Sequence, residues 1–416
     1  MRIVKTIGLW LMRVVATIVL VATLAVVVTS VSPIYNFAKL CPFFGPDIYN
    51  PYANIDSAYM WRRANFHTHT RVEGPLNECD YWPEEVANEY LKYGYDIVTF
   101  SNHNEITEHP TLSGEAVSLY EHGYNLFKSH NLVFGAEQVC RYDMLLPLSV
   151  SQRQFMLDML CRDADIVQMN HPLRTIATTD EHLRLLEGYT LIELDSGRST
   201  ENEYWDVALS AGHYVLGVAN DDLHYPDRSA SIAVRSNFLA TPSLSYDDVL
   251  STLRAGCFYA MRTPDYGAGE WQEKVRRNAM LPTVTGIGLR GDSDSVYIEL
   301  SSRADSIKFV GSDHRTLCLA KDTDSASFLL GPDEPFVRIT AYFPDGEVIY
   351  TNPFARYDSA VADSPRRRPS HTINWPYTLL FNSVLVVVAI GLILLYIRVV
   401  SYKFERCKTG PKANRE

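Results

Sequence analysis

Asn65-Phe66-His67-Thr68-His69-Thr70 places two imidazoles two residues apart, directly after a short apolar run. In an extended segment the side chains alternate between two faces, so His67 and His69 point the same way and can bind one ion. A lone His-x-His pair is equally typical of two hydrogen-bonded histidines at a strand end. Further ligands elsewhere in the chain are therefore needed to indicate a metal site.

Residues of the metal-binding type do recur, each just after a run typical of a β-strand. They are His103 after 96–100, Glu137 after 132–134, His171 after 166–169, and Asp222 with His224 after 214–218. Helix-like segments separate these runs, and alternating strands and helices favour a parallel sheet. In closed α/β barrels the chemistry lies on loops at the carboxyl ends of the strands, where all these candidates fall. Histidines that merely fill a core would not share that position.

The expected helices alternate with these strands. The first begins at Pro83, which suits the first turn of a helix, and carries acidic residues near its start. The predicted helices are 83–91, 114–128, 151–162, 180–186, 202–211 and 246–255, and further strands are predicted at 190–194 and 238–240.

The pattern changes after Met261. Short alternating runs follow at 296–300, 307–310 and 337–342, and Asp345-Gly346 is typical of a hairpin turn. We expect a small antiparallel β-sandwich here. Its one ligand-like pair, Asp313-His314, is isolated and more typical of a turn.

Two apolar segments are long enough to be candidate membrane-spanning helices. Val14 to Val31 follows Arg2, Lys5 and Arg13 and reads as a signal anchor or a long signal peptide, with its length favouring an anchor. Thr378 to Ile397 is free of charge and matches the ~20 residues that cross a bilayer.

The flanking charges indicate an orientation, because cytoplasmic ends collect Lys and Arg. Both ends are basic, so we expect both in the cytoplasm and the body between them outside it. The triplet 366–368, all arginine, argues the other way. The basic tail residues are Arg398, Lys403, Arg406, Lys408, Lys412 and Arg415.

The resulting order of segments has a signal anchor, a catalytic domain, a second domain and a second span. The boundaries are 1–33 for the anchor, 34–61 for a linker, 62–264 for the α/β domain, 265–282 for a linker, 283–357 for the β-sandwich, 358–377 for a linker, 378–397 for a transmembrane helix and 398–416 for a cytoplasmic tail.

Composition narrows the function. The net charge is −11 and the basic residues concentrate at the membrane ends, so high-affinity nucleic-acid binding is disfavoured. Six of the seven cysteines lie between the two apolar segments, an even number that permits disulfides outside the cytoplasm. Their irregular spacing is equally typical of free thiols, and it gives no support to a zinc finger.

These motifs together resemble those of the PHP (polymerase and histidinol phosphatase) family of metal-dependent phosphoesterases, over about 64–262. The resemblance implies a distorted seven-stranded (β/α) barrel that carries two or three divalent metals. The matching motifs are His67-Thr68-His69-Thr70, Ser101-Asn102-His103-Asn104, Gly135-Ala136-Glu137, His171-Pro172 and Asp222-Leu223-His224.

The resemblance also implies roles for single residues. His67, His69 and Asp222 would hold one metal, and Glu137 would bridge it to a second metal bound by His171. His103 and His224 would serve a third metal. Glu193 falls where some relatives have another ligand, but a supporting contact with a ligand is favoured here.

Three departures bear on this assignment. Asn102 stands where the family has an acid, which removes a charge beside His103 and affects how that imidazole is oriented. The family's acid or His soon after His-x-His has no clear equivalent, and Glu73, Glu78 and Asp80 are the candidates, with Glu78 preferred. No His closely follows Glu137, where some members of the family carry one, so the middle metal is expected to be poorly held. We expect two tightly held metals in all, because the third position, at His103 and His224, needs one of these acids as a further ligand.

The expected chemistry is attack of a metal-activated hydroxide on a phosphate ester. Clustered divalent ions lower the pKa of a bound water and stabilise an in-line displacement at phosphorus, so the chain need not supply a nucleophile. Mixed His and carboxylate ligands suit Zn, Mn or Fe. Phosphate also needs positive charge at the mouth of the site. The arginines on loops at this end are Arg71, Arg174, Arg198 and Arg228.

The predicted substrate is a phosphorylated small molecule or a lipid-linked phosphate, handled by an integral membrane protein with its catalytic domain outside the cytoplasm. Two other classes stay open. One is a catalytically silent metal-binding sensor or assembly protein that uses the β-sandwich as its interaction surface. The other is a metal-dependent hydrolase of a non-phosphate bond such as an amide.

Overall fold

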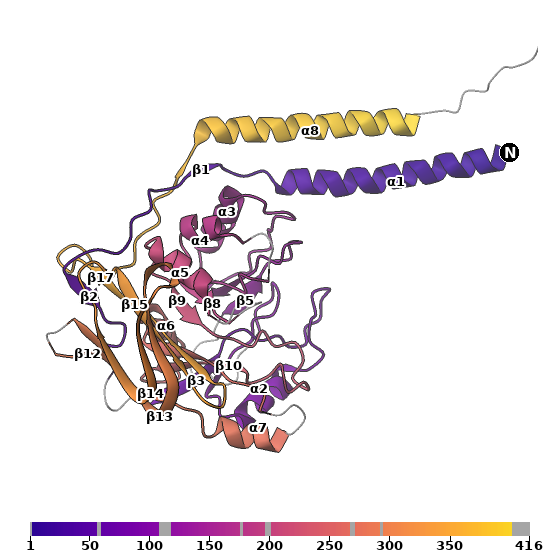
Figure 1. Cartoon of the computed structure of the whole chain (residues 1–416). Helices are drawn as coiled ribbons and strands as arrows, with labels where there is room; N and C mark the ends of the chain where they lie inside the picture. Colours follow the sequence, from indigo (N-terminus) through magenta and orange to yellow (C-terminus); the bar gives the residue numbers. More distant parts are fainter. Residues whose placement is uncertain are drawn as a thin grey trace, which may run out of the picture.

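The structure is a computed structural model that describes residues 2–55, 60–107, 118–174, 178–195, 201–266, 271–291 and 294–401. It has a mixed α/β body from which two long helices extend side by side (Figure 1). The helices are α1 (Arg2–Thr29), α2 (Pro83–Lys92), α3 (Val150–Leu160), α4 (Asp180–Leu185), α5 (Glu203–Ser210), α6 (Tyr246–Ala255), α7 (Trp271–Asn278) and α8 (Trp375–Ser401), with a 3-10 turn η1 (Ser312–His314).

Two sheets build the body. The smaller has the order β5-β6-β7-β8-β9, with antiparallel pairing from β5 to β7 and parallel pairing from β7 to β9. Its strands are β5 (Leu119–His122), β6 (Asn131–Phe134), β7 (Ile166–Met169), β8 (Leu191–Glu193) and β9 (Leu216–Val218).

The larger sheet has eleven strands and follows the path β12-β13-β15-β16-β11-β10-β3-β4, with β14, β17 and β2 added at its side. Its strands are β2 (Asp47–Tyr49), β3 (Trp61–Asn65), β4 (Ile97–Val98), β10 (Arg235–Ala240), β11 (Phe258–Arg262), β12 (Val284–Leu289), β13 (Ser295–Val310), β14 (Thr316–Leu329), β15 (Phe336–Tyr342), β16 (Val348–Thr351) and β17 (Phe354–Tyr357). A separate pair joins β1 (Tyr35–Asn36) to β18 (Thr372–Ile373).

The two sheets meet at single bridges on both sides. His103 bridges to Glu121, and Thr68 bridges to Leu223, each in parallel fashion. These bridges join the ends of β4 and β3 to the neighbourhood of β5 and β9. The junctions between the sheets thus gather the segments that carry the candidate ligands, while a closed seven-stranded barrel stays a prediction.

The antiparallel strands after residue 283 are part of the larger sheet, because β16 pairs with β11. Side chains alternate along β11, so one strand serves two cores. Phe258 and Ala260 belong to the core of the α/β body, whereas Tyr259 and Met261 pack with Ile298 and the other C-terminal strands. The strands of the expected sandwich are therefore continuous with the sheet of the α/β body, and the expected linker 265–282 contains α7.

The expected helices at 83–91, 151–162, 180–186, 202–211 and 246–255 correspond to α2 through α6. Local signals account for their starts: Ser149 accepts a hydrogen bond from the amide of Gln152 at 3.2 Å, and Ser245 caps α6 in the same way. The helix predicted over 114–128 is wrong, since Leu119–His122 form the fully buried strand β5. The start of that range, 114–117, lies outside the described residues.

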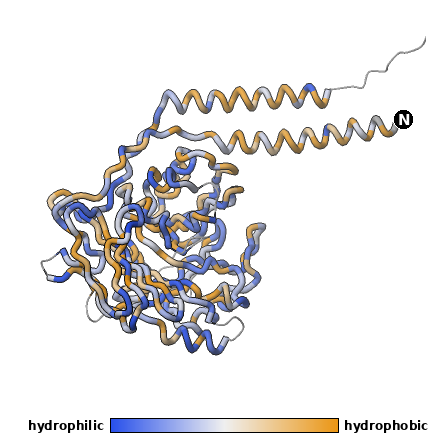
Figure 2. The backbone as a smooth tube through the Cα atoms, viewed as in Figure 1, coloured by the Kyte–Doolittle hydropathy of each residue, from blue (hydrophilic) through white to orange (hydrophobic). Residues whose placement is uncertain are grey.

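The two terminal helices are long, apolar and antiparallel. By length and composition, Thr6–Thr29 and Trp375–Ser401 could each cross a membrane. Thr17 Oγ1 lies 3.0 Å from the hydroxyl of Tyr396, and the Ser32 amide donates to Asn382 Oδ1 at 3.4 Å. Apolar residues run along both helices (Figure 2), and both leave the body in the same direction. The six described cysteines carry free thiols.

Candidate metal centre

Glu121, on β5, is the centre of the cluster of candidate ligands. Its Oε1 faces Nε2 of His67 at 3.2 Å, Nδ1 of His130 at 3.1 Å and Nε2 of His171 at 3.3 Å. Its Oε2 faces Nε2 of His69 at 3.3 Å and Nε2 of His103 at 3.1 Å. One buried carboxylate therefore faces five imidazoles and divides them between its two oxygens.

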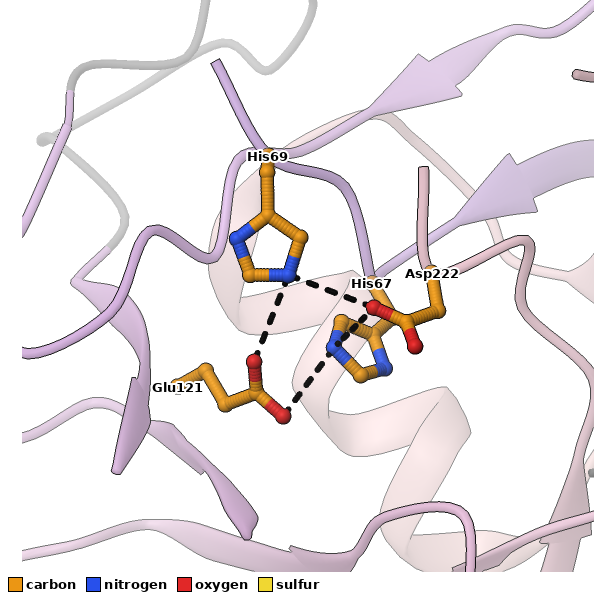
Figure 3. Close-up of side chains that lie close together, drawn as sticks. All are labelled: His67, His69, Glu121 and Asp222. Carbon is orange, nitrogen blue, oxygen red and sulfur yellow. Dashed lines mark ion pairs between the residues drawn. The ribbon is translucent and has the colours of Figure 1, made fainter. Parts of the chain in front are cut away.

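Asp222 provides a second carboxylate for the same group of histidines. Its Oδ1 lies 3.1 Å from Nε2 of His67, 3.3 Å from Nε2 of His69 and 3.2 Å from Nε2 of His224. The four side chains of His67, His69, Glu121 and Asp222 converge from three separate segments (Figure 3), and all four are buried. Their ligand atoms lie within 4.8 Å of one another.

A third carboxylate, Glu78, closes the group on its solvent side. Its Oε2 lies 3.0 Å from Nε2 of His103 and 3.7 Å from Nδ1 of His224. The Glu78 side chain is 44% exposed, whereas that of Glu121 is 1% exposed. The acids of the centre thus range from fully buried to open to solvent.

The residues around the ligands hold them in place. Glu193 Oε1 lies 2.9 Å from Nδ1 of His67, which leaves Nε2 of that ring free to face the cluster, and Glu193 Oε2 accepts from the His171 amide at 2.8 Å. Asn102 accepts from the Thr70 amide at 2.7 Å and donates to Thr70 Oγ1 at 2.8 Å. Glu193 therefore contacts His67 directly, whereas Asn102 holds the backbone at Thr70, next to His69, and not the ring of His103.

Backbone conformation at two ligands is unusual. His171 has φ 25° and Asp222 has φ 51°, in the left-handed region that non-glycine residues seldom adopt. Neighbouring Asp221 accepts hydrogen bonds from the amides of Ala233 at 2.7 Å and Arg235 at 2.8 Å, which fixes this turn. Strained backbone held by surrounding contacts is typical of functional sites.

The charges of the cluster are strongly coupled. Burial alone would raise the pKa of Glu121 and Asp222, but the facing imidazoles outweigh it and hold both well below the usual carboxyl range. Burial alone would lower the pKa of His67 and His69, but Asp222 and Glu121 raise both, that of His69 to about 9. The hydrogen bond to His103 lowers the pKa of Glu78 to about 2. All three carboxyl groups are therefore anionic at neutral pH.

The donor set fits a divalent cation better than a hydrogen-bonded network. The buried Nε2 atoms of His67 and His69 make no hydrogen bond to any described residue, although carboxylate oxygens lie 3.1 to 3.3 Å away. Buried polar atoms are rarely left without a partner. Imidazole nitrogens and carboxylate oxygens that converge without good hydrogen-bond geometry are placed as ligands of a common ion.

The structure brings most of the predicted ligands together, with one substitution. His67, His69, Glu78, His103, His171, Asp222 and His224 all lie in the cluster. Glu137 is exposed, and no described contact joins it to the ligands. Glu121 occupies the bridging position instead. The other loop acids, Glu73 and Asp80, are exposed, and among the described contacts only Glu78 reaches the histidines.

Two residues of the centre, Glu121 and His130, were missed. The misassigned helix over 114–128 concealed Glu121, and the Gly-x-Glu pattern drew attention to Glu137. The usable signal was alternation, because Tyr120 and His122 point away from the side on which Glu121 lies. His130 follows Glu121 by nine residues, which provides the imidazole that appeared to be missing after Glu137.

Arginine and open space lie at the mouth of the centre. Arg174 forms an ion pair with Oδ2 of Asp222, Arg228 stacks 3.8 Å from the ring centre of Tyr225, and Arg71 stacks 4.8 Å from that of Trp82. Arg198 lies outside the described residues. A cavity of about 400 Å³ is lined by Asn77, Glu78, Asp80, Tyr81, His224 and Tyr225, so the exposed side of the centre opens to solvent.

Comparison with known proteins found one distantly similar structure and no matching family. No protein-family model matches the chain, and no curated protein matches it. A crystal structure of a two-domain protein from Bacteroides vulgatus, described as containing a predicted PHP-like metal-dependent phosphoesterase, is similar at 14% identity and a TM-score of 0.37. The similarity covers 76% of this chain and 100% of that one. A likeness at this level assigns neither a fold nor a reaction to the chain.

Proposed function

We propose that the chain is a membrane-anchored, metal-dependent phosphoesterase. The observation that supports this is the convergence of six imidazoles on Glu121 and Asp222, with buried ring nitrogens that lack hydrogen-bond partners among the described residues. The motifs of the chain also follow the order typical of the PHP family.

Three positions for a cation follow from the contacts. The first has His67, His69, Glu121 and Asp222, the second has Glu121 Oε1 with His130 and His171, and the third has Glu78 and His103 with His69 or His224. Divalent ions in such sites lower the pKa of a bound water and stabilise charge at a phosphoryl group. Zn, Mn and Fe all suit this mixture of nitrogen and oxygen ligands.

The residues of the chain have distinct roles in this proposal. Glu193 fixes the ring of His67, and Glu121 would serve the first two positions, since its Oε2 faces His69 and its Oε1 faces His130 and His171. Arg174 lies beside Asp222 with a side chain that is 44% exposed, so its remaining N–H groups can meet a phosphate oxygen. Arg228 and Arg71 add positive charge at the rim.

The proposed topology has α1 and α8 as spanning helices, with both termini in the cytoplasm and the body outside it. The contact between Thr17 and Tyr396 supports two antiparallel spans, which would leave both chain ends on one side of the membrane. The basic terminal residues support the cytoplasmic assignment of the ends.

A substrate panel tests the proposed reaction. The full chain in detergent is stripped with a chelator, reloaded separately with Zn, Mn and Fe, and assayed against an aryl phosphate monoester, a diester and an aryl amide. We expect phosphate-ester turnover that needs metal and that His69→Ala abolishes. Turnover of the amide alone would indicate a different hydrolase, and metal binding without any turnover would favour the silent sensor. Full activity in the stripped protein would refute the proposal.

A further inference from the structure

The loop between Glu121 and His130 pairs with a segment that contacts the end of α1. Residues 123–129 connect β5 to β6, and residues 142–148 run alongside: the Leu126 amide donates to the Leu145 carbonyl at 3.1 Å. Asp143 Oδ2 accepts from the amides of Tyr124 at 2.8 Å and Asn125 at 3.0 Å. These two segments, 123–129 and 142–148, therefore form one unit, the paired loops.

The paired loops contact the last residues of α1 directly. The Tyr142 hydroxyl donates to the Thr29 carbonyl at 3.1 Å, and the Leu145 amide donates to Thr29 Oγ1 at 3.4 Å. At the start of α3, Gln152 Nε2 donates to the Ser30 carbonyl at 3.3 Å. Figure 1 shows α3 directly below this end of α1. Because Thr29 ends the apolar span, the paired loops lie at the level where that span would leave a bilayer.

The paired loops expose large apolar side chains at this level. Leu126 is 73% exposed, Leu148 is 66% exposed and Tyr124 is 42% exposed. Exposed apolar groups that gather in one place usually mark a contact surface. The paired loops are hydrogen-bonded to the end of α1, the helix that would enter the bilayer. The partner expected for these exposed side chains is therefore the lipid surface.

An exposed aromatic residue lines the mouth of the centre, and two exposed apolar residues neighbour ligands in sequence. Tyr225 lines the cavity beside Glu78 and is 47% exposed. Leu76 is two residues from Glu78 and Ile106 is three residues from His103, and both are exposed. Arginine and apolar side chains therefore occur together near the mouth. That combination suits a molecule with a phosphate at one end and hydrocarbon at the other.

The distance between lipid and centre is short. Leu126 is four residues from His130, and four extended residues span at most ~14 Å. The polar layer of a bilayer is roughly 5 to 8 Å thick on each side. The paired loops would therefore keep the centre within ~14 Å of the side chains that meet lipid.

We propose that the substrate is a phosphate ester of a membrane lipid, taken from the leaflet against which the paired loops rest. This inference rests on the proposed phosphoesterase function and on α1 as a span. In the reaction the oxygen of water bonds to phosphorus and the bond between phosphorus and the lipid oxygen breaks. The lipid oxygen takes a proton that the water gives up, so the products are a lipid alcohol and inorganic phosphate.

The test compares one headgroup in two physical states. The metal-loaded full chain is reconstituted in phosphatidylcholine vesicles that contain phosphatidic acid, and its phosphate release is compared with that from water-soluble glycerol phosphate and an aryl phosphate. The variant combines Leu126→Ser with Leu148→Ser. The matched control is Leu329→Ser on β14, where the native leucine is 66% exposed on a different part of the body.

We expect phosphatidic acid to be hydrolysed faster than glycerol phosphate, and the double variant to lose about tenfold of that rate because two apolar contacts with lipid are removed. Its aryl phosphate turnover should match that of the wild type, as should all rates of Leu329→Ser. Aryl phosphate turnover without hydrolysis of phosphatidic acid would overturn this inference and leave the proposed function standing. Equal lipid rates in all variants would also overturn it, and no turnover of any ester would remove both proposals.

Discussion

Nδ1 of His130 lies 3.1 Å from Oε1 of Glu121, and the two residues stand on either side of one hairpin loop. His130 directly precedes β6, and Glu121 lies on β5, so the antiparallel pairing of these strands brings both to the centre. The hairpin thus provides the shared carboxylate and one imidazole as a unit. In the loop that joins them, the Leu126 amide donates to the carbonyl of Leu145, whose own amide donates to Thr29 at the end of α1.

Replacement of the shared carboxylate of Glu121 should abolish metal binding and turnover at the centre. Glu121→Gln keeps the size of the side chain but loses the negative charge that both oxygens present to five imidazoles. We expect a fall in phosphate-ester turnover of at least about 100-fold and a loss of metal, because two cation positions share this residue. Elemental analysis and turnover of the same preparation measure both effects.

The matched control is Glu137→Gln, which changes an exposed glutamate of the neighbouring segment. It should keep wild-type metal content and turnover. A loss of activity in Glu137→Gln with normal activity in Glu121→Gln would restore the family-based assignment and contradict the structure.

The number of bound metal ions should depend on whether free metal is present in excess or has been removed by dialysis. His130 gives the second position three protein ligands, so the first two positions should keep metal through dialysis. The third relies on Glu78, whose side chain is 44% exposed, and should lose its metal. Elemental analysis should give three equivalents with metal in excess and two after dialysis. Glu78→Gln should give two under both conditions and a lower rate, whereas three equivalents retained by that variant would exclude Glu78 as a ligand.

Much of this centre was accessible from the sequence because its ligands follow strands in short, ordered motifs. His67 and His69 share a face of one extended segment, so local geometry alone pairs them. Asp222 and His224 are found by the same i, i+2 spacing, although φ 51° at Asp222 takes this turn out of extended geometry. Glu78 was selected from three acids by its place in the loop. These residues needed no knowledge of distant contacts.

Glu121 could not be assigned in the same way. Leu119-Tyr120-Glu121-His122 is a short segment that local propensity does not restrict to a strand, and its strand state comes from pairing with β6. The continuity of β16 with β11 is likewise set by long-range pairing. The strand is apolar at four successive positions, Phe258, Tyr259, Ala260 and Met261, which predicts burial on both of its faces. The sequence does not indicate which elements cover each face.

Glu193 should act by positioning His67. It accepts from Nδ1 of that ring and from the His171 amide, and it is buried. Glu193→Gln should weaken metal binding about 10- to 100-fold, the usual cost of losing such a contact. A rise in metal concentration should restore turnover close to the wild-type rate, because no substrate contact is lost. A variant that stays inactive at saturating metal would point to a direct role for Glu193.

Stability should respond to pH in opposite ways with and without metal. In the stripped protein, the raised pKa values of His67 and His69 stabilise the fold fully below about 6.5, and that contribution is lost at higher pH, for His69 as pH rises towards about 9. The lowered pKa of Glu121, Asp222 and Glu78 contributes above about 4.5 and is lost as pH falls, for Glu78 towards about 2.

The melting temperature of stripped protein should therefore fall between about pH 6.5 and 9. Metal-loaded protein should show no such fall, since its ligand histidines are neutral, and should lose stability on acidification as protons compete with the ion. Tryptophan fluorescence in detergent can record both curves. His69→Gln should flatten the alkaline fall of the stripped protein. Parallel curves for stripped and loaded protein would show that no ion binds to these histidines.

The two termini should lie on the same side of the membrane. Thr17 on α1 meets Tyr396 near the far end of α8, so the chain returns along its own first helix. Cysteines in place of Thr17 and Tyr396 should cross-link through a short bifunctional maleimide, whereas a cysteine at Leu11 should not react with one at Asn382, which lies beside Ser32 at the opposite end of the pair.

A fluorescent reporter after Glu416 should report the cytoplasm. Protease added outside intact cells should cut near the exposed Arg367 and Arg368. Cleavage there only after lysis would place the body, and with it the metal centre, on the cytoplasmic side.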